Sequence, residues 1–455
     1  MSTWDDATAR LTSDEATLVS LWGEPGRAHL ALFDDAVRLI SIECPDGRFP
    51  SVGRVHAPAI RLERAMHDLY GLEPVGLPDT RPWLDHGPDP TAYPFLPVEG
   101  ENLHQIPVGP VHAGIIEPGH FRFTCDGETV VRLEQRLGYV HRGIDALMAG
   151  APIDAAGRLA GRVSGDSTVA YAIAFAGAVE DALGVAPPAR AVWLRALMAE
   201  LERVANHLGD IGAICNDASL SIMLAHCAML RERVLRTSAA CFGHRLMMDC
   251  VVPGGVACDL SDGAPVRALV GELRRRFPPL VELYDGTASL QDRTVGTGIV
   301  GPELVRCFGA GGYVGRAAGR DVDVRCRPGY APYDALRFDV PVRNAGDVNA
   351  RVWIRIKEVE QSLRLLDQIL DRLPGGPARL ELPTGSGEGH ALAEGFRGDV
   401  FAWVQIAGGH VARSHLRDPS WFQWPLLEVA IEGNIVADFP LCNKSFNCSY
   451  SGHDL

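Results

Sequence analysis

Apolar side chains recur at spacings of three and four residues in two long segments of the chain. This spacing predicts two long helices, each of which buries one face. In residues 189–208 we expect Glu202 and Asn206 to lie opposite that buried face. The apolar positions are Leu194, Leu197, Leu201, Val204 and Leu208 in the first helix, and Val352, Ile356, Val359, Leu363, Leu366 and Leu370 in the second.

A different pattern, over about residues 15–75, predicts a small α/β unit. Residues 28–33 and 36–42 are extended apolar runs separated by Asp34-Asp35, which is typical of a β-hairpin. Residues 60–72 have helical spacing and a stop at Gly71. Residues 72–110 are rich in Pro and Gly, which predicts a linker or a wrapping arm with a domain boundary near residue 95.

The rest of the chain predicts a mainly helical domain with small β elements at its two ends. A hairpin bounded by Gly109-Pro110 and Pro118-Gly119 carries His112 in a tight loop, and helices follow to about residue 250. Residues 400–406 and 426–431 are apolar runs bounded by Gly and Pro, and we expect both to be extended. The predicted fold class is therefore α+β.

Composition and charge narrow the function classes. The 43 Lys and Arg against 57 Asp and Glu give a net charge of −14, spread along the chain, which argues against nucleic acid as a partner. The longest low-polarity run, residues 169–179, is well short of the roughly 20 residues that span a bilayer, so no direct membrane span is expected. The N-terminus also lacks the basic and apolar regions of a secretion signal.

The eleven cysteines are irregularly spaced and form no Cys-x-x-Cys pair. In a chain without a secretion signal this pattern predicts reduced thiols, most of them buried. A self-contained iron–sulfur or zinc site is not expected.

Four blocks of the sequence, taken in order, resemble a known family. They are LGYVHRGIDAL, GRVSGDSTVAYAIAFAGAVE, AELERVANHLGDIG and EGNIVADFPLCNKSFNCSYSGHDL. These blocks are similar to the large subunit of membrane-bound, energy-converting nickel–iron hydrogenases and to the quinone-site large subunit of respiratory complex I. The stretches RLERAMHDLYGL and LPDTRPWL resemble the small peripheral subunit of complex I, which formate hydrogenlyase carries fused to its large subunit. The resemblance implies a peripheral-subunit-like domain with linker at residues 1–95 and a hydrogenase-like domain at residues 96–455.

The resemblance also shows what this chain lacks. The four cysteines that hold the nickel–iron centre in those hydrogenases correspond here to Ser164, Ser167, Ser449 and Gly452. Nickel and iron need soft, anionic sulfur donors, whereas a serine hydroxyl is hard and neutral and glycine has no side chain. We therefore expect no metal centre and no hydrogenase activity. The nearby Cys442 and Cys448 are expected to be buried free thiols.

In complex I the corresponding cavity receives a quinone headgroup between a hairpin histidine and a tyrosine. The resemblance retains the histidine as His112, places Arg162 at the tyrosine's position and puts Tyr171 where hydrogenases have a histidine. We expect His112, Arg162, Asp166 and Tyr171 to be cavity or quinone-binding residues, with His112 as hydrogen-bond donor and proton source. The candidate occupant is a quinone or another small substrate, and no catalytic residue is identified.

Each candidate also has a structural interpretation. His112 can be a hairpin histidine with a satisfied hydrogen bond, Ser164 and Ser167 can be helix N-caps, and Asp166 can form a buried ion pair with Arg162. The pair Arg203 and His207, one helical turn apart, can be ion-pairing or interface residues.

The resemblance implies an oxidoreductase subunit of the NADH–quinone oxidoreductase or hydrogenase-related type, without a cofactor of its own. Its expected partners are a small subunit with an iron–sulfur cluster, a ferredoxin-like subunit, and antiporter-like membrane subunits that couple electron transfer to ion translocation. These would hold it on the cytoplasmic side of the cell membrane. A non-catalytic scaffold is the alternative, and an active hydrogenase is the least favoured. Leu455 lies near the point where hydrogenases are cut during metal insertion, so no maturation step is expected if Leu455 is the encoded end of the chain.

Overall fold

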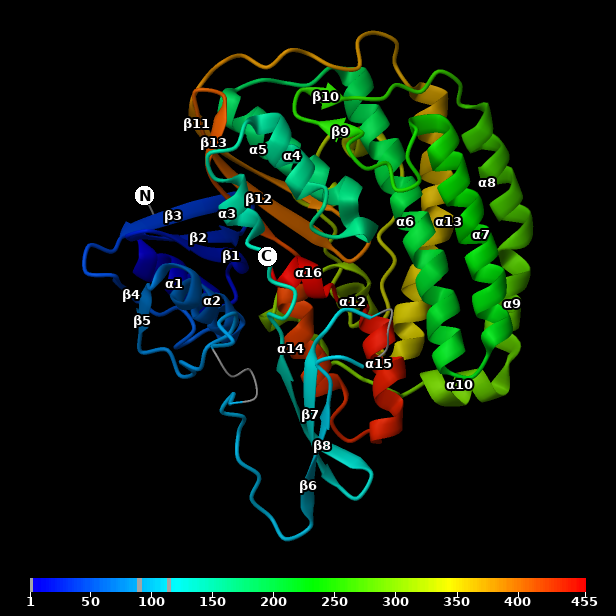
Figure 1. The fold of residues 1–455 in the computed structure, drawn as a ribbon. Coiled ribbons are helices and arrows are strands. Elements are labelled where there is room, and N and C mark those ends of the chain that lie inside the picture. The colour runs from blue at the N-terminus through cyan, green and yellow to red at the C-terminus, as the bar shows by residue number, and fades with distance from the viewer. Residues whose placement is uncertain (1–2, 88–91, 113–115) are drawn as a thin grey trace.

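The computed structural model describes residues 3–87, 92–112 and 116–455 and shows a mixed arrangement of helices and sheets. In Figure 1 an N-terminal unit lies on one side, a bundle of long helices on the other, and the sheet β11–β13 between them. Among the described residues, no helix combines the length and apolar character needed to cross a bilayer.

The N-terminal unit confirms the predicted hairpin and helix. Strands β2 and β3 pair across Asp34-Asp35, and α2 ends at Gly71, whose φ of 66° suits a residue without a Cβ. Strand β1, which the sequence pattern did not reveal, adds a third strand whose residues are mostly buried. The elements are α1 (Trp4–Thr12), β1 (Thr17–Glu24), β2 (Arg27–Phe33), β3 (Val37–Glu43), β4 (Arg48–Pro50), α2 (Ile60–Tyr70) and β5 (Glu73–Val75).

The Pro- and Gly-rich stretch after β5 contains no helix or strand within its described residues 76–87 and 92–102. It is fixed by polar contacts. The carboxylate of Asp68 on α2 accepts hydrogen bonds from the backbone N–H groups of Trp83 and Leu84, each at 2.6 Å, and Arg136 donates to the carbonyl of Pro82 at 2.7 Å. The segment is therefore an arm wrapped between the two parts of the chain.

The next sheet, β6–β8, projects from the body of the molecule (Figure 1). Its strands are β6 (Leu103–Val108), β7 (His120–Asp126) and β8 (Thr129–Arg136). The predicted hairpin is present, because β6 pairs with β7. Of the connection between them the structure describes residues 109–112 and 116–119, and the Gly119 N–H donates to Pro110 O at 3.0 Å. The expectation of helices directly after this hairpin is wrong, because β8 adds a third strand and also bonds the segment after α14 through Val130 and Asn434.

Both long helices are confirmed, as α6 (Ala189–Asp217) and α13 (Val348–Arg372). The expectation that Glu202 and Asn206 face away from the core is wrong: both are 7% exposed, since α6 is surrounded by protein on nearly every side. The other helices between β8 and α13 are α3 (Ile144–Met148), α4 (Ile153–Ala160), α5 (Thr168–Leu183), α7 (Ser221–Phe242), α8 (Ala264–Arg276), α9 (Pro278–Gly286), α10 (Ala288–Thr294), α11 (Pro302–Cys307) and α12 (Gly312–Ala317).

The sheet β11–β13 packs against α5 and contains the predicted strand at residues 400–406. Residues 426–431, expected to be extended, instead end helix α14. This helix is buried on most sides, so its continuous apolar run shows no helical period, and such a run cannot be told from a buried strand. The elements are β9 (Val251–Val252), β10 (Gly255–Val256), β11 (Gly387–Glu394), β12 (Asp399–Ala407), β13 (His410–Arg417), α14 (Ser420–Ala430), α15 (Phe439–Phe446) and α16 (Tyr450–His453). Short turns of other helical types span Ala57–Ala59, Gly165–Ser167, Arg325–Gly329, Tyr333–Ala335 and Val436–Asp438.

We predict that Leu208→Ala lowers the free energy of unfolding by about 2–5 kcal/mol, because Leu208 on α6 is fully buried and its truncation leaves a cavity. Leu147→Ala is the matched control, since Leu147 is 57% exposed, and it should change stability by less than about 0.5 kcal/mol. Chemical denaturation followed by circular dichroism measures both variants. Equal losses would contradict the packing described for α6.

Candidate functional site

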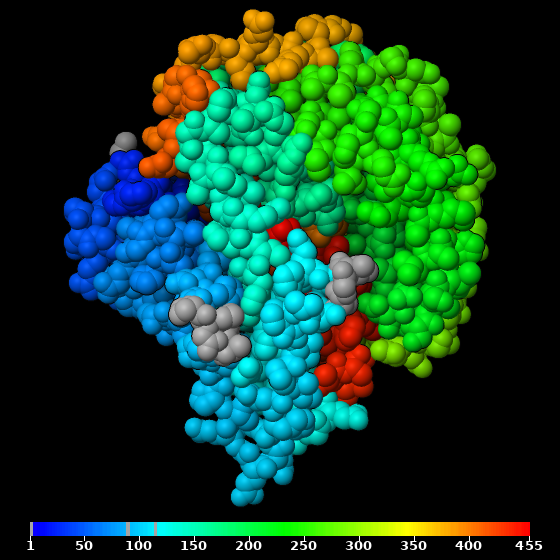
Figure 2. Space-filling model, viewed as in Figure 1, coloured from blue at the N-terminus to red at the C-terminus, as the bar shows by residue number. Residues whose placement is uncertain are grey.

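Three segments far apart in the chain meet at one place: the loop before α5, the turn between β11 and β12, and the segment from Asn447 to His453. They bring together the four positions that the resemblance assigns to metal ligands. Ser449 Oγ donates to Ser164 Oγ at 3.4 Å, and Gly452 N–H donates to Ser449 Oγ at 2.9 Å. Ser167 Oγ lies 3.1 Å from a guanidinium nitrogen of Arg397 in the β11–β12 turn. In Figure 2 the red C-terminal segment is visible at the bottom of a recess between cyan and green parts of the chain.

An ion pair between Asp166 and Arg397 lies at the centre of this meeting point. Arg397 donates from Nη1 to Asp166 Oδ1 at 2.9 Å and from Nη2 to Oδ2 at 2.5 Å, and its side chain is 5% exposed. The serine hydroxyls of Ser164 and Ser167 also donate to Asp166 Oδ1. Burial by itself would raise the pKa of Asp166, but the Arg397 charge and these hydrogen bonds outweigh it and lower the pKa to about 2. Asp166 is therefore ionised at neutral pH.

The expected pairing of Asp166 with Arg162 is wrong. Arg162 turns outward and forms a two-pronged ion pair with Asp249, at 2.5 and 2.6 Å, in which both side chains are about 40% exposed. Asp166 and Arg162 are only four positions apart in the chain, but the guanidinium that reaches Asp166 comes from the distant β11–β12 turn.

Ser164 and Ser167 occupy the N-cap positions expected for them, before the short turn Gly165–Ser167 and before α5, but neither side chain makes a capping hydrogen bond. Glu202 on α6 performs that role instead. Its carboxylate accepts hydrogen bonds from Val169 N–H at 2.7 Å and Ala170 N–H at 3.1 Å, which satisfies two N–H groups of the first turn of α5. Burial raises the pKa of Glu202 to about 8.

Tyr171 is fully buried, and its hydroxyl donates to Asp418 at 2.7 Å. Burial and this carboxylate raise the pKa of Tyr171 well above its usual value. The same carboxylate fills the space beside Gly452, because a Cβ at position 452 would lie 2.5 Å from Asp418 Oδ2. Any side chain at position 452 would therefore require Asp418 to move.

A cavity of about 190 Å³ opens beside this network. Its lining is mostly polar. His112 is not among the lining residues that the structure describes; its ring lies 5.9 Å from that of Phe121, and burial lowers its pKa. The lining residues are Ile116, Glu117, Ser164, Asp166, Arg397, Asn443, Lys444, Asn447, Cys448, Ser449 and Tyr450.

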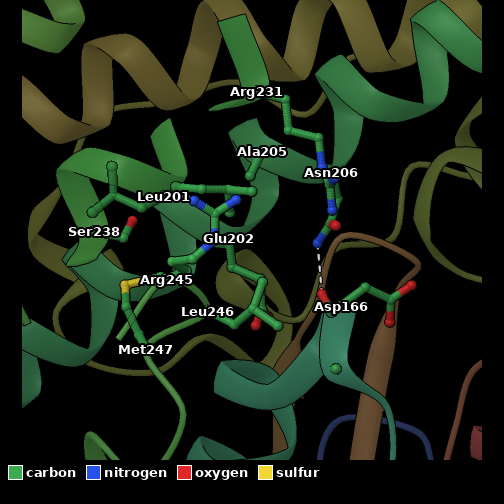
Figure 3. A pocket seen from close by; sticks show the side chains of 12 residues that line it. Asp166, Leu201, Glu202, Ala205, Asn206, Arg231, Ser238, Arg245, Leu246 and Met247 are labelled. Carbon is green, nitrogen blue, oxygen red and sulfur yellow. Dashed lines mark hydrogen bonds between the residues drawn. The ribbon is translucent and has the colours of Figure 1, made fainter. Parts of the chain in front are cut away.

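A narrow crevice reaches the same loop from the other side, between α6, α7 and residues 245–247 (Figure 3). It is about 10 Å³ in volume, which is room for about one water molecule. Asn206 donates to the backbone carbonyl of Asp166 at 2.6 Å, and Glu202 and Arg231 also line the crevice. Asp166 thus separates the crevice from the larger cavity.

The residues present do not fit a nickel–iron centre. Three hydroxyls and a glycine supply no thiolate, and the hydroxyls of Ser164 and Ser167 already donate to Asp166. Cys448 and Cys442 are buried free thiols, as expected, and burial raises the pKa of both. Such thiols stay protonated at neutral pH and are poor ligands. Within the described parts of the chain, no group of three or more His, Cys, Asp or Glu is placed to hold a metal ion.

Sequence reasoning missed Arg397, Asp418, Glu202 and Lys444. Asp166 and Arg397 are 231 positions apart, so no local spacing links them. The one local signal was the stretch EGFRGD, in which glycines flank Phe396 and Arg397 directly after an apolar strand. Such glycines predict a tight turn that presents its side chains at one edge of a sheet.

We predict that Arg397→Ala destabilises the protein by about 3 kcal/mol, because it leaves the Asp166 carboxylate without its main partner. Arg162→Ala is the control and should cost less than about 1 kcal/mol, since its ion pair with Asp249 is half exposed. Denaturant unfolding of the two variants measures the difference. A larger loss of stability in Arg162→Ala than in Arg397→Ala would contradict the pairing of Arg397 with Asp166 and would favour the pairing with Arg162 expected from the sequence.

The lowered pKa of Asp166 makes a pH-dependent prediction. A carboxyl whose folded pKa is depressed stabilises the folded state above its unfolded pKa of about 4 and loses that contribution as the pH falls toward 2. The difference in melting temperature between the native chain and Asp166→Asn should therefore be constant from pH 7 to about 5 and shrink below about 4. A difference that grows on acidification would contradict the ion pair.

Comparisons with known proteins identify the family of this chain. Residues 217–386 match the family model described as the 49 kDa subunit of respiratory-chain NADH dehydrogenase. The chain is 32% identical over 445 residues to formate hydrogenlyase subunit 5 of Escherichia coli, covering 91% of this chain and 78% of that protein. It is 30% identical over 341 residues to an NADH-quinone oxidoreductase subunit of Desulfotalea psychrophila, covering 73% of this chain and 91% of that protein.

A solved structure is also similar to this chain over most of its length. A chain of the membrane-bound sulfane sulfur reductase, an archaeal respiratory membrane complex, matches with a TM-score of 0.73 and 27% identity, covering 78% of this chain and 99% of that one. The resemblance inferred from the four sequence blocks is thus confirmed. This chain belongs to the family of large subunits shared by formate hydrogenlyase-type hydrogenases and complex I-like NADH–quinone oxidoreductases.

Proposed function

We propose that this chain is the large subunit of a membrane-associated, complex I-like oxidoreductase complex, in which a cavity for a small polar ligand takes the place of a metal centre. One observation carries the proposal. Beside the place where the four ligand positions of the hydrogenases converge, this chain has a cavity of about 190 Å³. Two of those positions, Ser164 and Ser449, are in its lining, together with amide, carboxylate, ammonium and guanidinium groups. A few convergent polar groups around a concave site are typical of small-molecule binding.

The residues around the cavity have distinct roles in this proposal. Asp166 is held ionised by Arg397, so it accepts hydrogen bonds and orients the serines, and it does not supply protons. Ser449 donates to Ser164, which donates to Asp166, so a ligand at Ser449 meets a chain of hydroxyls already aligned in one direction. Lys444 adds a positive charge to the lining that can pair with a negatively charged or strongly polar group.

A quinone is less well supported as the occupant. The resemblance places Arg162 at the position of the quinone-binding tyrosine, and this side chain faces Asp249 at the surface. His112 is absent from the described cavity lining, and Tyr171 is bonded to Asp418 inside the protein. A small polar ligand matches the lining better than an apolar ring does.

The remaining parts of the proposal follow from the relatives. Formate hydrogenlyase subunit 5 and the NADH-quinone oxidoreductase subunit of Desulfotalea psychrophila are, by their names, parts of redox enzymes, and the structural neighbour is part of a respiratory membrane complex. We assign residues 1–95 to a peripheral-subunit-like domain and residues 96–455 to the hydrogenase-like domain. An iron–sulfur small subunit would dock near loops 109–112 and 162–167 and the C-terminal segment. A ferredoxin-like subunit and antiporter-like membrane subunits would complete the complex on the cytoplasmic side of the membrane.

A scaffold or coupling subunit without its own substrate is the second candidate. The observation that favours it is that the groups of the site already bond to each other: Arg397, Ser164 and Ser167 all donate to Asp166, and Arg397 also donates to Ser167. Groups whose hydrogen bonds are already satisfied within the protein gain less free energy from binding a ligand than groups without such partners.

Turnover of the purified whole complex separates these functions. With small polar acceptors, we expect Lys444→Met to lower turnover about tenfold, because it removes a charge-assisted hydrogen bond from the cavity. His112→Ala is the control and should change turnover less than about twofold, since His112 lies outside the described lining.

Each of the other two functions gives a different result in the same assay. A quinone site predicts that a short-chain quinone is reduced and that His112→Ala abolishes this reduction. A scaffold predicts that Lys444→Met and His112→Ala both leave turnover unchanged. Either outcome would contradict the proposed small-ligand cavity.

A further inference from the structure

Eight ionisable side chains form a cluster inside the second part of the protein, between α6, α12, α13, β11 and residues 323–325. Each is at most 3% exposed. Of the two roles expected for Arg203 and His207, ion pairing is confirmed, because both side chains belong to this buried cluster and pair with Glu358. Its members are Glu200, Arg203, His207, Arg316, Asp323, Arg325, Glu358 and Glu394, joined by ion pairs of 2.6–3.5 Å.

The charges in this cluster do not balance. Four carboxylates face three guanidinium groups, so the cluster carries a net negative charge if every carboxyl is ionised and His207 is neutral. An uncompensated charge in a buried region is strongly unfavourable. The cluster therefore favours the uptake of one proton.

His207 is a poor place for that proton. Its Nε2 lies 2.7 Å from Glu358 Oε2, but among the described residues its buried Nδ1 has no hydrogen-bond partner. A doubly protonated ring would leave that second N–H unsatisfied. Burial also lowers the pKa of His207. The neutral ring, with Nε2–H donating to Glu358, fits these contacts.

Glu394 has the weakest compensation among the four carboxylates. It accepts one hydrogen bond from Arg316 Nη1 at 3.0 Å and one from Val324 N–H at 3.2 Å. Glu358, by comparison, lies 2.6 Å from Arg316 Nη2, 2.9 Å from Arg316 Nε and 2.7 Å from His207. Glu200 and Asp323 each have at least three hydrogen bonds of 3.0 Å or less.

The groups that face Glu394 come from several elements. Arg316 from α12, Arg203 from α6, and Asp323 and Arg325 from the segment after α12 all act on its charge, with Arg320 more weakly linked. The Tyr330 hydroxyl accepts from the Glu394 N–H at 3.2 Å. Burial, followed by Asp323, raises the pKa of Glu394 to about 7 against the opposing effect of the arginines. This supports the assignment made from the contacts.

Glu394 is also connected to the cavity. Arg203 donates to the carbonyl oxygens of Glu394 at 2.9 Å and Gly395 at 3.0 Å. The turn that begins there closes through Gly395 N–H and Gly398 O at 2.9 Å and carries Arg397 to Asp166. Arg203 thus contacts both the buried cluster and the turn that presents Arg397 to the cavity.

We propose that Glu394 holds one exchangeable proton for this buried cluster, and that its loss is transmitted through Arg203 and the β11–β12 turn to the Arg397–Asp166 pair. The inference does not depend on which ligand the cavity binds. A complex that couples redox chemistry to ion movement requires groups whose protonation changes the structure elsewhere. Glu394 would give this chain such a group. Neither Glu394 nor Arg203 is among the described residues that line the cavity, so both are positioning residues and not catalytic ones.

Infrared difference spectroscopy of the full chain in its complex tests the first half. Buried Glu63 and Glu202, whose pKa values burial raises to about 7 and about 8, should also give carboxylic acid bands near neutral pH. In addition to these, we expect one carbonyl band, that of Glu394, to disappear as the pH rises through about 7. The band should be missing from Glu394→Gln and unchanged in Glu388→Gln, a control at an exposed position of the same strand. The assignment would be overturned if the native chain and Glu394→Gln gave the same set of carboxylic acid bands.

Nitrogen-15 arginine NMR tests the second half. The Arg397 Nε–H signal, assigned by its loss in Arg397→Lys, should shift with the same midpoint as the infrared band in the native chain and in Glu388→Gln. It should not titrate in Glu394→Gln. An Arg397 signal independent of pH, or one with a different midpoint from the carboxyl band, would overturn the coupling. Because both midpoints are measured in the native chain, their comparison tests the coupling even where Glu394→Gln fails to fold.

Discussion

The ion pair between Asp166 and Arg397 organises the site of this protein. It joins the loop before α5 to the β11–β12 turn, and Arg397 also bonds the carbonyl of Asn447 in the C-terminal segment. Three distant parts of the chain are thereby fixed by one guanidinium whose side chain is 5% exposed. A charge at such a position is tolerated only with a close partner, so the pair and the arrangement of the cavity depend on each other.

This arrangement explains how the fold of a metal enzyme can persist without metal ligands. In a hydrogenase the metal centre links the two halves of its own site through four thiolates, whereas here hydrogen bonds join the same positions. Ser449 contacts Ser164, and the Asp418 carboxylate fills the space beside Gly452. Asp418 also accepts from Tyr171, so that the region behind the cavity is closed by polar contacts inside the protein. At the positions that the resemblance assigns to metal ligands, this chain has a network of hydrogen-bonded side chains.

Parts of this structure could be predicted from the sequence because they depend on local patterns. The apolar stripes of α6 and α13, the β2–β3 hairpin and the stop of α2 at Gly71 are encoded in neighbouring residues. Helix α14 was mistaken for a strand because its burial on most sides removes the periodic signal. The partners of the site residues could not be found in the same way. Arg397 reaches Asp166 across 231 positions, and Glu202 caps α5 across more than thirty, so both depend on the tertiary fold.

The central claim is that this site is held together by hydrogen bonds and one ion pair, where its hydrogenase relatives use nickel and iron. Elemental analysis of the purified native complex, normalised to the amount of this chain, tests it most directly. The account predicts only trace nickel, with any iron accounted for by clusters in partner subunits. One nickel per chain, retained after treatment with a chelator, would contradict it.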